Sequence, residues 1–585
     1  MAETARDSAG TPFAGAAPRP ADAAAPDRPW RRPGAGRYAL TRLRGIARPP
    51  VEVVEPDAQS LVVERDVEVG TRDGTVLRAN VHRPVGDGPF PVVLCAHPYG
   101  KDNLPTRKRF GKGYTLPFQY RALRQTAPVR FSALTSWESP DPAFWTAQGY
   151  AVVNADLRGC GHSDGVGRPF ADQEGEDVHD LIEWAGIQPW STGRVAMMGV
   201  SYLAITQWKA AATRPPHLVA IVPWEGFSDA YRDLLRPGGI RETGFVKMWS
   251  RGVKSNRLAY DIGAEFAEHP TRDDYWRSLV PDLAAIEVPA LICGSFSDNN
   301  LHSRGSMRAF ENISSTERHL YTHRSGKWAT FYSDEAQRSQ IDFLARHLRA
   351  DDTAPALPTV RLEVRDSRDS VVEVRDESQW PPASTQWTSL HLGHSGLTPD
   401  APEAGSIFFD PAKTGVRFGI TFDADTEICG SATLSLFVSV DDADDVDLYV
   451  GIEKWRGAEY VPFEGSYGFG RDRVTTGWMR ASMRDLDPGL STPTAPVPTY
   501  ERRRPLAAGE VVPVDIPFGP SATLFRRGEQ LRLVVAGRWL WPRNPLTGNA
   551  PAAYERGSRG RTTVHWGGDT PSRLLVPVTA VRPAH

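Results

Sequence analysis

A series of short, uninterrupted apolar runs constrains the fold of this chain more than any other feature. The runs are FPVVLCAHP, GYAVVNADLRG, GRVAMMGVS, LVAIVPW, VPALICGSF and RHLYTH, and segments of helical length separate most of them. Runs without polar alternation are typical of strands that are covered on both faces, as in parallel sheets. We therefore expect residues 60–350 to form an α/β sheet domain.

The sequence on either side of these runs predicts antiparallel structure. In LVVERDVEVGTRDGTVLRANVHRP, apolar and polar residues alternate around an Asp-Gly pair at 73 and 74, which predicts a hairpin that opens the sheet. From about residue 355 the strands are short and alternating, as in ATLSLFVSV and QLRLVVAG, without helical spacers. We expect residues 355–585 to form a β-sandwich of jelly-roll type, after a catalytic domain over residues 56–350.

Two segments need a separate interpretation. Residues 225–285 form a connection too long for a simple crossover, and their helix-like stretches with interspersed aromatics predict a helical cap over the sheet. Residues 1–55 are rich in Ala, Pro and Arg and contain no apolar run long enough for a signal peptide. We interpret these residues as a disordered tail and expect a cytoplasmic protein.

Composition argues against several classes of partner. The 585-residue chain has 68 basic and 71 acidic residues, a formal net charge of -3, which provides no field to attract nucleic acid or an anionic membrane. The four cysteines lie far apart and form no C-x-x-C pair, so neither a metal site nor a redox site is expected. We expect no organic cofactor. The oligomeric state stays open, with a homodimer as one alternative.

The stretch RVAMMGVSYLAITQW places one serine between a predicted strand and a predicted helix. Gly199 lies two positions before Ser201, and the helix begins at Tyr202. A strand, a tight turn and a helix together make the nucleophile elbow of α/β-hydrolases, where the helix N-terminus favours an oxyanion. A simple helix cap at Ser201 also fits this turn, so both readings stay open here.

Acidic and basic side chains follow the next strands of the predicted sheet. Asp298 stands just beyond VPALICGSF, and His323 ends the run RHLYTH. The carboxyl ends of parallel strands share one edge, so Ser, Asp and His in this order can converge there. His302 and His319 compete for the role of base. His302 follows Asp298 too closely to come from a separate strand, and His319 begins its strand, so we expect His323 to be the base.

The loop after FPVVLCAHP offers a second donor for an oxyanion. Tyr99 stands in this loop, and its phenolic hydroxyl can donate to a developing negative charge, beside the Tyr202 amide. An alternative is that Tyr99 only packs within the loop. The Gly-rich run DLRGCGHSDG has neither a G-x-G-x-x-G pattern nor a Walker lysine, which argues against phosphate binding.

Several of these segments resemble one known family. HPYGK, NADLRGCGHSDG, MGVSYLAITQW, CGSFSDNNLHSRGS and the β-rich C-terminal region are similar to the CocE/NonD hydrolases, which include cocaine esterase and the X-Pro dipeptidyl-peptidases of peptidase family S15. The resemblance spans roughly residues 60–580. It implies an α/β-hydrolase core with a helical cap, followed by a C-terminal jelly roll.

The same resemblance implies a role for each candidate residue. These are Ser201 as nucleophile, Asp298 as triad acid, His323 as triad base, and the Tyr99 hydroxyl with the Tyr202 amide as the oxyanion hole. Two departures from the family pattern stand out. Ala204 replaces the final glycine of the G-x-S-Y-x-G motif, and the chain reads YTHRSGKWATFYS where many members place the histidine after G-P-W.

We expect a serine hydrolase that acts by acyl transfer on a small ester, an amide or a short peptide. Carboxylic ester hydrolysis ranks first and Xaa-Pro dipeptidyl-peptidase activity second, because fold and triad do not determine the substrate. An exopeptidase needs an acid for the substrate amino group, and Glu225 and Asp229 are candidates, although both could equally cap a helix. The alternative from another class is a ligand-binding protein with a degenerate hydrolase domain.

Overall fold

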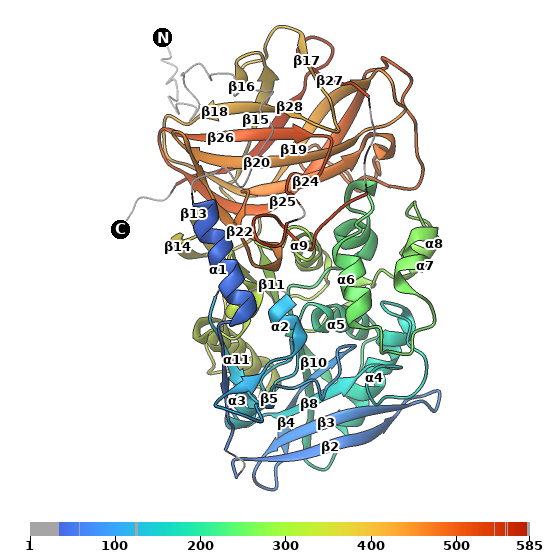
Figure 1. The fold of residues 1–585 in the computed structure, drawn as a ribbon. Helices are drawn as coiled ribbons and strands as arrows, with labels where there is room; N and C mark the ends of the chain where they lie inside the picture. Colours follow the sequence, from blue (N-terminus) through green and yellow to red (C-terminus); the bar gives the residue numbers. More distant parts are fainter. Residues whose placement is uncertain are drawn as a thin grey trace, which may run out of the picture.

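The computed structural model describes residues 34–57, 59–122, 127–542, 544–555, 557 and 560–581. Figure 1 shows a sheet covered by helices in the lower half of the molecule and a domain built from strands in the upper half. Helices of the cap lie at the junction of the two. In the part of the chain that is described, no helix is both long and apolar enough to cross a membrane.

The N-terminal domain is built on one mixed sheet. In spatial order its strands are β2 (Leu61–Gly70), β3 (Val76–Pro84), β8 (Ala151–Asp156), β4 (Phe90–His97), β9 (Ser191–Val200), β10 (Leu218–Trp224), β11 (Ala290–Ser295) and β12 (Arg318–His323). The pairs β2–β3 and β3–β8 are antiparallel and the others are parallel. Each uninterrupted apolar run therefore forms a strand, and the predicted α/β-hydrolase fold class is confirmed.

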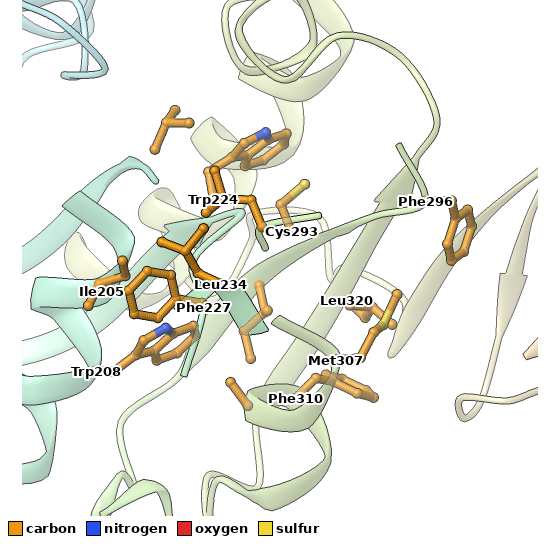
Figure 2. Packing of buried hydrophobic residues seen from close by; sticks show 14 of the residues in the cluster. Ile205, Trp208, Trp224, Phe227, Leu234, Cys293, Phe296, Met307, Phe310 and Leu320 are labelled. Carbon is orange, nitrogen blue, oxygen red and sulfur yellow. The ribbon is translucent and has the colours of Figure 1, made fainter. Parts of the chain in front are cut away.

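Helices cover both faces of this sheet. They include α3 (Pro142–Ala147), α4 (Asp172–Gly186), α5 (Tyr202–Ala212), α9 (Ser303–Asn312), α10 (Lys327–Phe331) and α11 (Asp334–Leu348). Nearly every residue of α5 is buried, as expected for a helix that is apolar on all sides. Figure 2 shows Trp208 of α5 and Trp224 of β10 among the buried side chains around Phe227. This packing fixes the helix that follows Ser201.

The connection predicted to form the cap, and a second long connection over residues 102–145, carry short elements. Residues 102–145 contain β5 (Thr106–Arg107), β6 (Tyr114–Thr115), α2 (Phe118–Ala122), β7 (Val129–Ser132) and the start of α3. Residues 225–285 contain η2 (Tyr231–Leu235), η3 (Pro237–Gly239), α6 (Phe245–Gly252), α7 (Ile262–Glu268), α8 (Asp274–Ser278) and η4 (Leu283–Ala285). In Figure 1, α6, α7 and α8 stand beside the sheet and below the strands of the upper domain. The connection over residues 225–285 is thus helical, and it lies where a cap would lie.

The C-terminal domain is an antiparallel sandwich. One layer contains β15 (Gln386–Gly393), β28 (Arg573–Thr579), β19 (Thr426–Val440), β25 (Val512–Phe525), β27 (Thr562–Trp566) and β17 (Gly405–Phe409), and the other contains β18 (Gly415–Thr421), β26 (Glu529–Ala536), β20 (Asp447–Arg456) and β24 (Thr475–Arg480). Strand β13 (Val360–Ser367) pairs in parallel with β12, so the hydrolase sheet continues into this domain.

The N-terminal segment departs from the predicted disordered tail. Residues 1–33 lie outside the described residues, but α1 (Ala35–Ala47) and β1 (Val51–Val54) are formed. Tyr38 and Arg42 lie one turn apart on the buried face of α1. The Arg42 guanidinium donates to the carbonyl of Gly468 at 2.7 Å, and the Tyr38 hydroxyl accepts from the Gly470 amide at 2.9 Å. These long-range bonds, which no local pattern indicates, hold the helix on the C-terminal domain.

Candidate active site

Ser201 occupies a sharp turn between β9 and α5. Its φ is 61° and its ψ is -113°, a conformation that costs a non-glycine residue energy and persists only where the surroundings enforce it. A Cβ on Gly199 would lie 2.5 Å from Leu203 Cβ, and one on Gly226 would lie 2.7 Å from Ala204 Cβ. Small residues are thus required for this close approach, and the turn has the geometry of a nucleophile elbow.

The imidazole that meets Ser201 belongs to His302. The His302 Nε2 atom lies 2.9 Å from the Ser201 Oγ atom. His302 is buried and sits at the N-terminal end of α9, after β11. Burial, followed by the nearby charge of Lys327, holds the pKa of His302 well below its usual value. A neutral imidazole at hydrogen-bond distance from a serine hydroxyl is the arrangement that general base catalysis needs.

His323, the predicted base, lies elsewhere. Its Nε2 atom is 2.9 Å from Glu225 Oε1, and its Nδ1 atom accepts from the Ser325 amide at 3.2 Å. Both ring nitrogens are therefore engaged in a buried network, and the expectation that His323 contacts Ser201 is wrong. Glu225 directly follows β10, and its carboxylate binds the His323 imidazole, which is therefore not at Ser201.

Asp298 also has a different partner from the predicted one. Its Oδ2 atom accepts from Lys327 Nζ at 2.6 Å, and among the described residues its Oδ1 atom has no hydrogen-bond partner. The Nδ1 atom of His302 likewise has no partner in the described part of the chain. The predicted contact of Asp298 with the His323 imidazole is not formed, because Asp298 binds Lys327 and His323 binds Glu225. Asp298 instead contacts His302 through its backbone, because its carbonyl accepts from the His302 amide at 3.0 Å.

The two predicted oxyanion donors lie beside the serine. The Tyr99 hydroxyl accepts from Trp249 Nε1 at 3.4 Å and lies close to the Ser201 side chain. Burial, together with the charge of Glu138, raises the pKa of Tyr99 well above its usual value, so the phenol keeps its proton. The Tyr202 amide opens α5, where the first N–H groups have no intrahelical acceptor. Both groups can therefore donate.

The Tyr202 side chain has a separate structural role. Its hydroxyl donates to Glu174 Oε2 at 2.7 Å, and its ring stacks on Trp249 of the cap. Burial raises the pKa of Glu174 to about 7. A small pocket beside these residues is lined by Pro98, Leu157, Arg158, Cys160, Gly167, Arg168, Pro169, Glu174, Tyr202, Trp249, Val253, Asn256 and Leu258. The cap thus packs directly on the residue that follows the serine.

The two carboxylates considered for a substrate amino group are both engaged within the protein. Glu225 is fully buried and binds His323. Asp229 is 3% exposed and accepts from the guanidinium of Arg272 at 3.0 Å. A second guanidinium, that of Arg232, lies 3.2 Å from the same carboxylate. Neither carboxylate is therefore available to a ligand in this arrangement.

Two residues of the site carry no sequence motif. Glu138, in the loop before α3, has a φ of 66°, and its carbonyl accepts from the Val200 amide directly before the serine. Burial raises the pKa of Glu138 to about 8 against the opposing charge of Lys327. Lys327 is 8% exposed, and although burial lowers its pKa, the charges of Asp298, Glu225 and Glu138 raise it above its usual value. In the sequence, only the departure from the family pattern at YTHRSGKW indicated that Lys327 lies near the edge of the sheet where the candidate residues gather.

Comparison with known families assigns both halves of the chain. Residues 73–262 match the family described as X-Pro dipeptidyl-peptidase (S15 family). Residues 353–575 match the X-Pro dipeptidyl-peptidase C-terminal non-catalytic domain. The first range covers the hydrolase sheet from β3 to β10 with part of the cap, and strands β2, β11 and β12 lie outside it. The second range covers most of the antiparallel sandwich.

Relatives and solved structures agree with these matches. Cocaine esterase from Rhodococcus sp. (strain MB1 Bresler) is 28% identical over 405 residues, an alignment that spans 59% of this chain and 65% of that protein. A crystal structure of a CocE/NonD family hydrolase from Staphylococcus aureus superimposes with a TM-score of 0.84 at 36% identity, covering 89% of this chain and 94% of that one. An α-amino acid ester hydrolase structure, 16% identical, shares the fold over 90% of this chain and 98% of its own, with a TM-score of 0.67.

Proposed function

The chain belongs to the CocE/NonD family of hydrolases, and we propose that it cleaves carboxylic esters through an acyl-enzyme on Ser201. The observation that carries the proposal is the 2.9 Å contact between the Ser201 hydroxyl and the His302 imidazole. The strained turn at Ser201 supports the same role, because strain of this kind concentrates at functional sites. A serine that only caps a helix would need neither feature.

The first half of the reaction follows from this pair. Ser201 Oγ attacks the ester carbonyl carbon while His302 Nε2 takes the hydroxyl proton. The negative charge that develops on the carbonyl oxygen is stabilised by the Tyr99 hydroxyl and the Tyr202 amide. When the tetrahedral intermediate collapses, the C–O bond to the alcohol breaks and the proton on His302 passes to the leaving oxygen. The acyl group then remains on Ser201.

Water completes the cycle by the same route. His302 takes a proton from a water molecule, whose oxygen attacks the acyl-enzyme carbonyl, and returns that proton to Ser201 Oγ as the acid leaves. Every proton transfer in this scheme uses His302 Nε2. The predicted base, His323, takes no part in the proposed reaction because its ring nitrogens are bound to Glu225 and to the Ser325 amide.

Ester substrates are favoured over Xaa-Pro peptides by the state of the acidic side chains. A dipeptidyl-peptidase must compensate the charge of a substrate ammonium group, and an unpaired carboxylate is the ordinary means. Glu225 and Asp229 are bound to His323 and Arg272 respectively, so they do not offer such a carboxylate. Small carboxylic esters are therefore the proposed substrate class, with Xaa-Pro peptides as the alternative.

The decisive experiment is labelling with a fluorophosphonate in wild type and Ser201→Ala. Turnover of p-nitrophenyl acetate and of an Ala-Pro p-nitroanilide is measured on the same preparations. We expect labelling that requires Ser201, and turnover of the ester only. Turnover of the anilide would make the protein a dipeptidyl-peptidase. A folded wild type without labelling or turnover would favour the ligand-binding alternative.

A further inference from the structure

Lys327 is a buried cation at the candidate active site, and the ester mechanism above does not use it. It is the first residue of α10, only 8% exposed, and its Nζ atom lies 2.6 Å from Asp298 Oδ2. A buried ammonium is costly unless it is paired and hydrogen-bonded. The presence of a buried ammonium beside Ser201 and His302 therefore needs a functional explanation.

The position of Lys327 on the sheet edge is informative. In α/β-hydrolases the acid of the triad follows one strand and the base follows a later one. Asp298 follows β11 here, and the side chain that reaches it from beyond β12 is a lysine. The base, His302, comes instead from the start of α9, only four residues after Asp298. Lys327 thus occupies the place beside Asp298 that the imidazole occupies in the usual arrangement.

Asp298 connects Lys327 to the base through backbone bonds. The Asp298 carbonyl accepts from the amides of Leu301, His302 and Ser303, at 3.1, 3.0 and 3.2 Å. These bonds form the turn from which the His302 side chain points at Ser201. An ion pair that fixes the Asp298 side chain therefore also fixes the orientation of the imidazole.

We propose that Lys327 is a positioning residue of the hydrolase: its ion pair with Asp298 holds the turn that carries His302 to Ser201. The inference rests on the proposed function of Ser201 and His302. Lys327 does not itself act as the base, because it is charged and bound to Asp298.

The charges around Lys327 are consistent with this role. Three carboxylates and one imidazole face it: Asp298 after β11, Glu225 after β10, Glu138 before α3 and His302 at the start of α9. Farther along the same network lie His323 of β12 and Tyr467 of the C-terminal domain. Because burial raises the pKa of Glu138 to about 8, this carboxyl is mainly uncharged at neutral pH. The positive charge of Lys327 is then compensated mainly by the carboxylates of Asp298 and Glu225.

The test compares Lys327→Met with Lys454→Met as a matched control. Lys454 is a fully buried lysine paired with Glu529 at 2.8 Å, but it lies on β20 of the C-terminal domain. For Lys327→Met we expect kcat on p-nitrophenyl acetate to fall by about 100-fold and KM to change by less than about threefold. A fall in kcat of this size is the effect of a small misplacement of a catalytic group. The control should keep its kcat.

The pH profile separates positioning from a merely structural role. The charge of Lys327 lowers the pKa of His302, so its loss should move the acidic limb of kcat/KM to higher pH. Lys327→Arg keeps the charge and should retain the position of the limb. Lys454→Met should also leave the limb unchanged. A Lys327→Met protein that is folded, with wild-type kcat and an unmoved limb, would overturn the proposal.

Two further measurements cover the remaining outcomes. If Lys327→Met does not fold, the double variant Lys327→Met/Asp298→Asn removes both charges of the pair. A low kcat in the folded double variant supports positioning, and a wild-type kcat overturns it. Fluorophosphonate labelling distinguishes the two hypotheses: full labelling with unchanged kcat in Lys327→Met rejects only the role of Lys327, whereas an unlabelled wild type rejects the proposed function and this inference together.

Discussion

His302 Nε2 and Ser201 Oγ lie 2.9 Å apart although the two residues are 101 positions apart in the chain. Ser201 is held by the turn between β9 and α5, and His302 by the turn that precedes α9. His302 is buried, and so are Val200 and Tyr202 on either side of Ser201. The pair is therefore preorganised for proton transfer, which lowers the barrier without a conformational change.

Replacement of the two competing histidines should have different effects. We expect His302→Ala to lower kcat by about four to six orders of magnitude, the range seen when a member of a catalytic triad is removed. His323→Ala should retain most of kcat but lose about 1–3 kcal/mol of unfolding free energy, because Glu225 is left buried without its partner. Steady-state kinetics and urea unfolding measure the two effects. A larger kcat loss in His323→Ala would contradict the assignment of the base.

Removal of the Tyr99 hydroxyl tests the oxyanion hole. Tyr99→Phe should lower kcat by about 10²- to 10³-fold with little change in KM, because the hydroxyl acts on charge that develops only in the transition state. Tyr150→Phe is the matched control, since it also removes a buried phenolic oxygen but lies outside the site. Equal kcat values for Tyr99→Phe and wild type would mean that Tyr99 only packs in its loop.

The pH dependence of the wild type should report the environment of His302. Burial and the Lys327 charge both lower the pKa of this imidazole, so its neutral form persists as the pH falls. Only the neutral form can accept the Ser201 proton. We therefore expect the acidic limb of kcat/KM to have its midpoint below about 6.5, the ordinary histidine value. Rates measured from pH 4.5 to 8 with a neutral ester test this, and a midpoint above 6.5 would be inconsistent with it.

Glu138 should make the folded state less stable as the pH rises. Its pKa is about 8 in the folded protein against 4.5 as the ordinary value, so between these pH values the folded state holds a proton that the unfolded chain has lost. The unfolding free energy of wild type relative to Glu138→Gln should then fall by about 2–4 kcal/mol between pH 5 and pH 8. Chemical denaturation at both pH values measures the difference. A constant difference between the two proteins would show that Glu138 is ionised when folded.

Most of the fold could be predicted because the signals are local. Uninterrupted apolar runs form β4, β8, β9, β10, β11 and β12. The segment in which apolar and polar residues alternate around an Asp-Gly turn forms the β2–β3 hairpin. The order of strand, tight turn and helix likewise places Ser201 correctly. These features depend on steric preferences and side-chain periodicity over fewer than about twenty residues, and the sequence displays such patterns directly.

The histidine that contacts Ser201 could not be predicted in this way. Chain order favoured His323, since a histidine after a separate strand is the usual arrangement, and it disfavoured His302 for its closeness to Asp298. The outcome depends on Glu225 binding one imidazole and on the start of α9 directing the other. Both are contacts between segments that are far apart in the chain, so no local pattern contains them.

The sequence by itself therefore determined the strands, the layers, the turn at Ser201 and the edge of the sheet where the candidate site residues gather. Tertiary structure alone decided which histidine reaches the serine, that Lys327 pairs with Asp298, and that α1 is held by Arg42 on the C-terminal domain. The physical reason is one of range. Backbone preferences and apolar periodicity act between residues that are neighbours in the sequence. A buried charge instead pairs with an opposite charge or hydrogen-bonding group that folding brings to within about 3 Å of it, and that group can lie anywhere in the chain.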